Sequence, residues 1–141
     1  MKKLLALSLV GMLVFTGCGK KDEEKNNPNN DGNNVQEQQP QVNTNQGVVE
    51  DKVLEEFNFT NASMIYENST TTLEVTVTNT SANTSYLREF NINAYDEAGN
   101  LMGTMIGFVG DNIPAGESKV ITANISMDLT NAAKLTYEVL R

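Results

Sequence analysis

The chain has 141 residues, a formal net charge of −8, one cysteine, and neither histidine nor tryptophan. A single cysteine excludes an internal disulfide, and the lack of histidine excludes imidazole-based metal or haem sites and histidine-dependent acid–base catalysis. The acidic balance disfavours binding to nucleic acid and electrostatic docking onto anionic lipid, because like charges repel.

The first residues have the three-part layout of a secretory signal. Two lysines precede an apolar run from Leu4 to Phe15, and small residues follow the run. The run has roughly a dozen residues, whereas about 20 are needed to span a bilayer. We therefore predict that residues 1–17 are a signal peptide.

Residues 14–18 read Val-Phe-Thr-Gly-Cys and resemble the lipobox of bacterial lipoproteins. In that family the cysteine thiol is alkylated by diacylglycerol, and a dedicated peptidase cuts immediately before the cysteine. The resemblance implies that Cys18 carries lipid and that Phe15, Thr16 and Gly17 flank the cleavage site, although Phe15 stands where the family usually has leucine. The alternative is an ordinary secretory signal cleaved nearby, with Cys18 as an incidental thiol.

Two or three acyl chains hold a protein firmly on a bilayer. The expected location is therefore the extracytoplasmic side of the cell membrane, with the lipid on Cys18 as the membrane contact. Removing Lys2 and Lys3 with the leader lowers the formal charge by two, to −10.

Residues 18–52 are predicted to be the lipidated cysteine and a disordered tether. The segment is rich in Asn and Gln, contains Pro28 and Pro40, and has almost no apolar side chains. Such a stretch cannot offset its ordering entropy by burial. As a flexible coil, residues 19–50 span roughly 30 Å.

Residues 53–141 change to alternating apolar and polar residues, the pattern of short antiparallel strands. A first strand breaks near Asn61, Asp96 to Asn100 form a turn in which Gly99 takes a positive φ, a strand runs from Leu101 to Val109, and a loop follows from Asp111 to Gly116. Strands at intervals of about 10 to 15 residues, each with one apolar face, predict two packed sheets. The residues expected to face the core include Phe57, Phe59, Leu73, Val75, Val77, Phe90, Ile92, Ala94, Leu135, Tyr137 and Val139.

Several of these segments together resemble the FxLYD family of small immunoglobulin-like extracellular domains. Tyr95 and Asp96 match the Tyr-Asp of the family's Phe-x-Leu-Tyr-Asp motif, whereas Ile92 and Ala94 replace its Phe and Leu. The resemblance covers about residues 70–126 and implies an all-β, immunoglobulin-like antiparallel β-sandwich at a cell surface, without implying any catalytic residue. The matching segments are Leu73 to Thr78, Asn79-Thr80-Ser81, Ile92 to Asp96, Gly99 to Gly103 and Pro114-Ala115-Gly116-Glu117.

Few residues suggest chemistry. Asp96 and Glu97 are adjacent in the predicted turn, where Asp is favoured because its side chain accepts hydrogen bonds from backbone amides. A calcium site there requires further oxygens, with Asp111 and Asp128 as the candidates. No Gly-x-Ser-x-Gly or Ser-x-x-Lys motif occurs. We predict neither catalytic residues nor a metal or other cofactor.

The most informative surface carries Tyr86, Leu87, Tyr95 and the strand from Leu101 to Val109. In this strand apolar residues occur at both odd and even positions, and therefore on both faces. One interpretation is a central strand packed on both faces. The other is an apolar patch that binds a protein partner or a second copy.

The sequence therefore predicts a non-enzymatic surface lipoprotein whose β-sandwich interacts with an envelope protein or a wall polymer. Two alternatives remain. One is an accessory or structural subunit of a membrane complex, or a module that self-associates through edge strands. The other is a small hydrolase with a carboxylate pair. The oligomeric state is not predicted.

Overall fold

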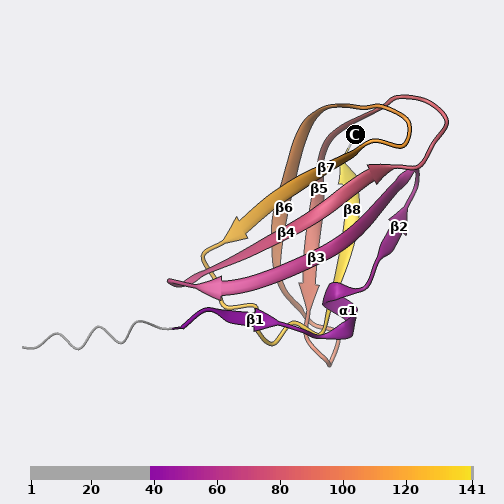
Figure 1. The fold of residues 1–141 in the computed structure, drawn as a ribbon. Coiled ribbons are helices and arrows are strands. Elements are labelled where there is room, and N and C mark those ends of the chain that lie inside the picture. Colours follow the sequence, from indigo (N-terminus) through magenta and orange to yellow (C-terminus); the bar gives the residue numbers. More distant parts are fainter. Residues whose placement is uncertain (1–38, 141) are drawn as a thin grey trace, which may run out of the picture. The chain divides into compact units, whose positions relative to one another are not determined.

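The computed structural model describes residues 39–140, which form strands, turns and one short helix (Figure 1). The predictions for residues 1–38, including Phe15, Thr16, Gly17 and Cys18, lie outside the described residues. The elements in chain order are β1 (Gln41–Asn43), α1 (Gln46–Val49), β2 (Lys52–Leu54), β3 (Phe57–Glu67), β4 (Thr70–Asn79), β5 (Ser85–Tyr95), β6 (Leu101–Ile113), β7 (Ser118–Ile125) and β8 (Lys134–Leu140).

The strands form two antiparallel sheets. One has the order β1-β3-β4-β7, with β2 also paired to β3, and the other has the order β6-β5-β8. The chain changes sheet after β4, after β6 and after β7. The order β3-β4-β7 with β6-β5-β8 corresponds to strands A-B-E and C′-C-F of immunoglobulin-like sandwiches. The predicted all-β antiparallel sandwich is confirmed.

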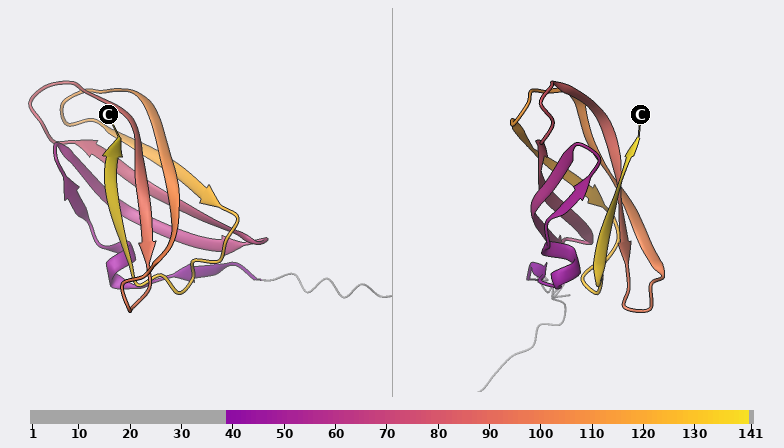
Figure 2. Two further views of the ribbon diagram at one scale, coloured as in Figure 1. Left: turned by 180° about the vertical axis from the view of Figure 1, so that it is seen from behind. Right: turned by 90° about the vertical axis from the view of Figure 1, so that its right-hand side faces the viewer.

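The core lies between the two sheets, which Figure 2 shows from two further sides. Period-two alternation turns Leu73, Val75 and Val77 of β4 inward, and each is at most 1% exposed. The ring of Phe59 stacks on that of Tyr137 at 4.3 Å between centroids, and it meets the ring of Phe90 edge-on at 5.0 Å. Such aromatic pairs stabilise the core by about 0.5–1.5 kcal/mol beyond the burial of area.

The predicted break of the first strand near Asn61 is wrong, because β3 continues through it. The register with β4 shifts between Thr60 and Ser63, as in a β-bulge, and Asn61 has a φ of 54°. The extra residue lets Ala62 and Met64 return to the inner face after the bulge. The predicted turn at Gly99 is confirmed, with a φ of 83°.

The strand expected from Leu101 to Val109 extends to Ile113, so the loop expected from Asp111 begins only after Ile113. This strand, β6, lies at the edge of its sheet, and the interpretation as a central strand is wrong. Gly107 lies opposite Phe90, and a Cβ on Gly107 would lie only 2.3 Å from the Phe90 ring. The ring therefore covers the glycine of the edge strand.

The folded region begins before Val53, so the tether predicted for residues 18–52 extends too far. Residues 41–43 and 52–54 pair with β3, and α1 lies between them. Asn43 is 3% exposed, and its Nδ2 donates to the carbonyl oxygens of Thr130 at 3.0 Å and of Ala132 at 2.9 Å. Partners more than 80 residues away thus order a polar stretch that composition alone assigns to disorder.

The helix α1 is a single turn in which Val48 is buried. Among residues 39–140, no helix is long and apolar enough to cross a membrane.

Candidate interaction surface

The sequence singled out three residues on β5, and the structure separates them. Tyr86 is 61% exposed, whereas Leu87 is 0% exposed and belongs to the core. Tyr95 lies at the opposite end of β5, nine residues from Tyr86, or about 30 Å along an extended strand. The three residues therefore do not form one surface, and Leu87 is not available to a partner.

Tyr95 contributes to the contact between β5 and β8. The Nζ of Lys134 lies 5.3 Å from the centroid of the Tyr95 ring, a cation–π contact. The backbone oxygen of Tyr95 accepts a hydrogen bond of 2.8 Å from the amide of Ala133. These contacts give Tyr95 a structural role at the start of β8.

An exposed apolar patch lies on the outer face of the three-stranded sheet, near the β6 edge. Ile106 is 57% exposed and Phe108 is 65% exposed, while the alternate residues Met105 and Gly107 are buried. Ile106 lies opposite Asn91 and Phe108 lies opposite Glu89. We call the set of Tyr86, Ile106 and Phe108 the outer patch.

Gly110 shapes the outer patch. It has a φ of 63°, and a Cβ there would lie 2.7 Å from the Phe108 ring. The Phe108 ring therefore lies over Gly110. Asn112, two residues further along β6, is the cross-strand neighbour of Tyr86. Any side chain at this position would displace Phe108, so Gly110 permits both the backbone conformation and the placement of the ring.

A second feature of this region is that the first ten residues of β6 carry no charge. Residues 101–110 contain neither a charged residue nor proline. Charge appears only at Asp111, whose Oδ2 pairs with the Nζ of Lys119 on β7 at 2.6 Å. Hydrogen bonding from Lys119 lowers the pKa of the Asp111 carboxyl below its usual value, so that this residue stays ionised near neutral pH.

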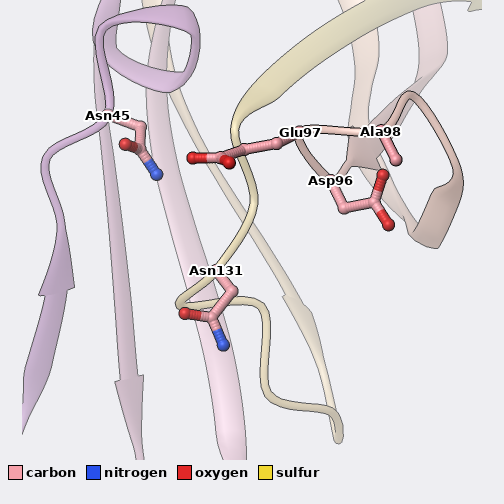
Figure 3. A pocket seen from close by; sticks show the side chains of 5 residues that line it. All are labelled: Asn45, Asp96, Glu97, Ala98 and Asn131. Carbon is pink, nitrogen blue, oxygen red and sulfur yellow. The ribbon is translucent and has the colours of Figure 1, made fainter.

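A polar pocket of about 620 Å³ opens at the other end of the sheet, lined by Asn45, Asp96, Glu97, Ala98 and Asn131. In Figure 3 the Glu97 side chain extends toward Asn45, whereas Asp96 turns back toward its own loop. The Asp96 carboxylate accepts hydrogen bonds from the side chain and backbone of Asn100, which lower its pKa. A carboxylate held ionised in this way is poorly suited to act as a general acid.

The calcium ligands considered from the sequence do not converge. Asp111 pairs with Lys119, and Asp128 accepts hydrogen bonds from the hydroxyl and backbone amide of Thr130. Within residues 39–140, no group of three or more His, Cys, Asp or Glu side chains is placed to hold a metal ion.

A second depression, of about 280 Å³, lies between β2 and β8 and is lined by Lys52, Val53, Leu54, Lys134, Leu135, Thr136 and Tyr137. Tyr137 is largely buried there, and desolvation raises its pKa to about 12. The phenol therefore stays neutral well above the pH at which a free tyrosine ionises.

Sequence reasoning named the strand that carries Ile106 and Phe108 but did not single out these two residues. The order Met105, Ile106, Gly107, Phe108 could have indicated them. A glycine in a strand often marks a place where other atoms approach the backbone closely, so Gly107 and Met105 would face inward and Ile106 and Phe108 outward. Asn45 and Asn131 carried no signal, since they belong to segments far apart in the chain.

No family model matches the chain, and neither the curated proteins nor the solved structures include a significant match.

Proposed function

We propose that the protein is a lipoprotein anchored through Cys18 to the extracytoplasmic side of the cell membrane, and that its β-sandwich is a non-catalytic module that binds another envelope protein. The observation that carries the anchor is the position of the only cysteine, directly after a basic start, an apolar run and two small residues. The resemblance to the FxLYD domains, also a proposal, supports a cell-surface setting.

The outer patch supports binding of a protein. The side chains of Tyr86, Ile106 and Phe108 are each 57–65% exposed, on β5 and β6 of the three-stranded sheet. Aromatic residues are enriched at protein interfaces, where they bury much area at little cost in side-chain entropy.

A non-catalytic role is supported by the polar pocket. Asp96 is held ionised by Asn100, and the pocket is open rather than enclosed. Hydrolysis by a carboxylate pair needs one carboxyl with a raised pKa.

A wall polymer is a second candidate partner, favoured by the same pocket. Carboxylate and amide groups of Asn45, Glu97 and Asn131 line it. Such groups exchange hydrogen bonds with the hydroxyl and amide groups of a polymer.

The anchor is tested by producing wild type and Cys18→Ala in a bacterium that processes lipoproteins. We expect wild type in the membrane fraction, with a mass increase of a diacylglyceryl group on the peptide that begins at Cys18, and we expect Cys18→Ala outside the membrane or unprocessed. Phe15→Leu is the matched control, and it should be processed at least as completely as wild type. Recovery of wild type as a soluble, unmodified protein would refute the anchor.

Binding is tested by photo-crosslinking in living cells from a reactive amino acid placed at Phe108, with Val120 as the control. Val120 is 61% exposed but lies on the other sheet. We expect one predominant adduct with another envelope protein from position 108 and none from position 120. Equal labelling from both positions would exclude the outer patch as the binding surface, and adducts with wall polymer alone would favour the second candidate.

A further inference from the structure

The chain enters the sandwich through a polar segment that contributes little to the core. We call residues 41–54, which contain β1, α1 and β2, the strap (Figure 1). Among the buried apolar side chains of the described residues, only Val48 belongs to the strap, and the others lie between Phe57 and Leu135. The other buried side chain of the strap is polar, that of Asn43. The two sheets therefore keep nearly all of their core when the strap is released.

The strap pairs with the larger sheet over short lengths. In the described part of the chain, β1 and β2 have three residues each and pair with β3 alone. By comparison, β3 pairs with β4 at nine positions. Between β1 and β2, α1 is a single turn of four residues, which is too short to be stable by itself. Segments with few buried apolar contacts open at a lower free energy than the core strands.

The strap is fastened to the smaller sheet at one end of β8. Gly47 bridges to Lys134, and the Nδ2 of Asn45 donates to the carbonyl oxygen of Ala132 at 2.7 Å. Asn43 adds its three hydrogen bonds to the loop that precedes β8. Further along, the depression of about 280 Å³ lies between β2 and β8. Because these contacts are gathered in one cluster, their loss frees the strap from β8 as a whole.

The strap is also the first part of the fold that a pull from the N-terminal side reaches. The chain is continuous, so tension between the proposed anchor at Cys18 and the outer patch acts on β1 and Asn43 before it acts on β3. The segment under the earliest load is therefore the segment with the fewest buried apolar contacts.

We propose that the strap opens as one unit while β3 to β8 remain folded, and that tension from the N-terminal side promotes this opening. Release of its 14 residues adds at most roughly 50 Å of extended chain between anchor and sandwich. The protein thus lengthens under load before its core is strained. The opening is a property of the fold alone, whereas its response to tension in the cell rests on the proposed anchor.

The first test measures amide hydrogen exchange at increasing denaturant in the full chain carrying Cys18→Ser. We expect the strap amides to exchange together, at least about tenfold faster than those of β4 and β5. Their exchange should depend less on denaturant, because opening exposes less surface than global unfolding. The β3 amides that face the strap should follow the strap. Strap amides that exchange at the rate of β4, with the same dependence on denaturant, would overturn the proposal.

A disulfide that fixes the strap in place provides a second variant for the same measurement. Val42→Cys with Ile65→Cys joins β1 to β3 at a directly opposed pair whose side chains are both exposed. Oxidation should slow strap exchange by at least about tenfold, and reduction should restore it. The matched control is Thr72→Cys with Asn124→Cys, opposed on β4 and β7, and it should leave strap exchange unchanged. Strap exchange that its own disulfide does not slow contradicts release as a unit.

The second test applies tension to single molecules of the Cys18→Ser chain, with one handle at the N-terminus and the other at Val120→Cys on β7. We expect an early step with a gain in contour length of at most roughly 50 Å, followed by a larger step as the sandwich unfolds. Asn43→Ala should lower the force of the early step and leave the later step unchanged, because the strap has already left the sandwich. Asn124→Ala is the control and should change neither step.

The two tests separate the parts of the proposal. Fast strap exchange combined with a single unfolding step would refute the response to tension, and a later step that also weakens in Asn43→Ala would show that strap and sandwich unfold together. Both tests use a chain without the lipidated cysteine. A failure of the proposed anchor would therefore appear only in the fractionation of wild type and Cys18→Ala, and would leave these two results unchanged.

Discussion

The two edges of the three-stranded sheet, β8 and β6, are protected to different degrees. At the start of β8, Asn43 and Asn45 bind the preceding loop, and Gly47 lies against Ala133 and Lys134. On β6, a strand of 13 residues whose first ten are uncharged, Ile106 and Phe108 are exposed. The contacts that cover the β8 edge come from a segment about 86 to 89 residues earlier in the chain.

The segment that contains β1, α1 and β2 has two roles. It forms an edge of the larger sheet, and it covers the start of β8. β1 and β2 pair with β3, and Gly47 of α1 forms a bridge to Lys134 of β8. β6 instead lies alongside β7, through the ion pair of Asp111 with Lys119 at one end and the approach of Gly103 to Ile125 and Met127 at the other. Substitutions that remove the cover of β8 should therefore destabilise the fold more than substitutions of the exposed side chains of β6.

The largest effect is expected for Asn43→Ala. The Nδ2 of Asn43 donates to three carbonyl oxygens, those of Leu129, Thr130 and Ala132, in a largely buried site. Losing these bonds leaves buried acceptors without a donor and lowers the free energy of unfolding by about 3 kcal/mol. Denaturant unfolding measures this change.

Asn124→Ala on β7 is the control for Asn43→Ala, because Asn124 is exposed. Its free energy of unfolding should stay within about 0.5 kcal/mol of wild type. Similar losses in both variants would show that the loop carbonyls do not depend on Asn43.

Gly47→Ala should be the next most damaging change. A Cβ at this position would lie 2.5 Å from the carbonyl oxygen of Ala133 and 2.9 Å from the Cβ of Lys134, so α1 has to move away from β8. We expect a loss of about 2 kcal/mol in the free energy of unfolding. Hydrogen exchange of the β8 amides should also become faster.

Gly103→Ala on β6 is the matched glycine control. Its new Cβ would meet only side-chain atoms, with the Sδ of Met127 nearest at 3.2 Å. A much smaller loss is expected, because the flexible methionine can shift. A greater loss at Gly103 than at Gly47 would reverse the proposed difference between the edges.

A smaller effect concerns the pH dependence contributed by Tyr137 on β8. Burial raises its pKa in the folded state to about 12, above the usual value of 10.0. Below pH 10 the phenol is neutral in both states, and its full contribution to stability is present. Between about pH 10 and 12 the unfolded state loses the proton first, so stability falls as pH rises.

We expect this fall to amount to about 2 kcal/mol, a value reduced for the part of the ring that water reaches. Tyr137→Phe removes it, and the measurement is the difference in unfolding free energy between wild type and the variant at pH 9 and at pH 12. A constant difference across this range would show that the phenol is not desolvated.

The smallest effect on stability is expected on the exposed edge itself. Ile106→Thr and Phe108→Thr replace side chains that are more than half exposed with a residue that also favours strands. In dilute solution the free energy of unfolding should change by no more than about 0.5 kcal/mol. A loss above about 1.5 kcal/mol in the monomer would show that these side chains stabilise the fold of the single copy.

The candidate site was predictable only in part. The apolar character of β6 is visible in the sequence, but the choice between a central strand and an exposed edge depends on which strands pair, and that depends on distant residues. Leu87 and Tyr86 are neighbours of similar apolar character, yet the fold buries one and exposes the other. The polar pocket joins Asn45, Glu97 and Asn131 from three separate segments, which no local pattern reveals.

The sequence by itself determined the strands and the core, since alternation with a period of two is local: Phe57, Phe59, Val75 and Ile92 all face inward as expected. Only the tertiary structure decided where the fold begins. Residues 41–52 are too polar to order themselves by burial, and they are ordered by pairing with β3 and by the hydrogen bonds of Asn43 to a loop near the end of the chain. The same long-range contacts decided that the start of β8 is covered by a segment from the beginning of the fold.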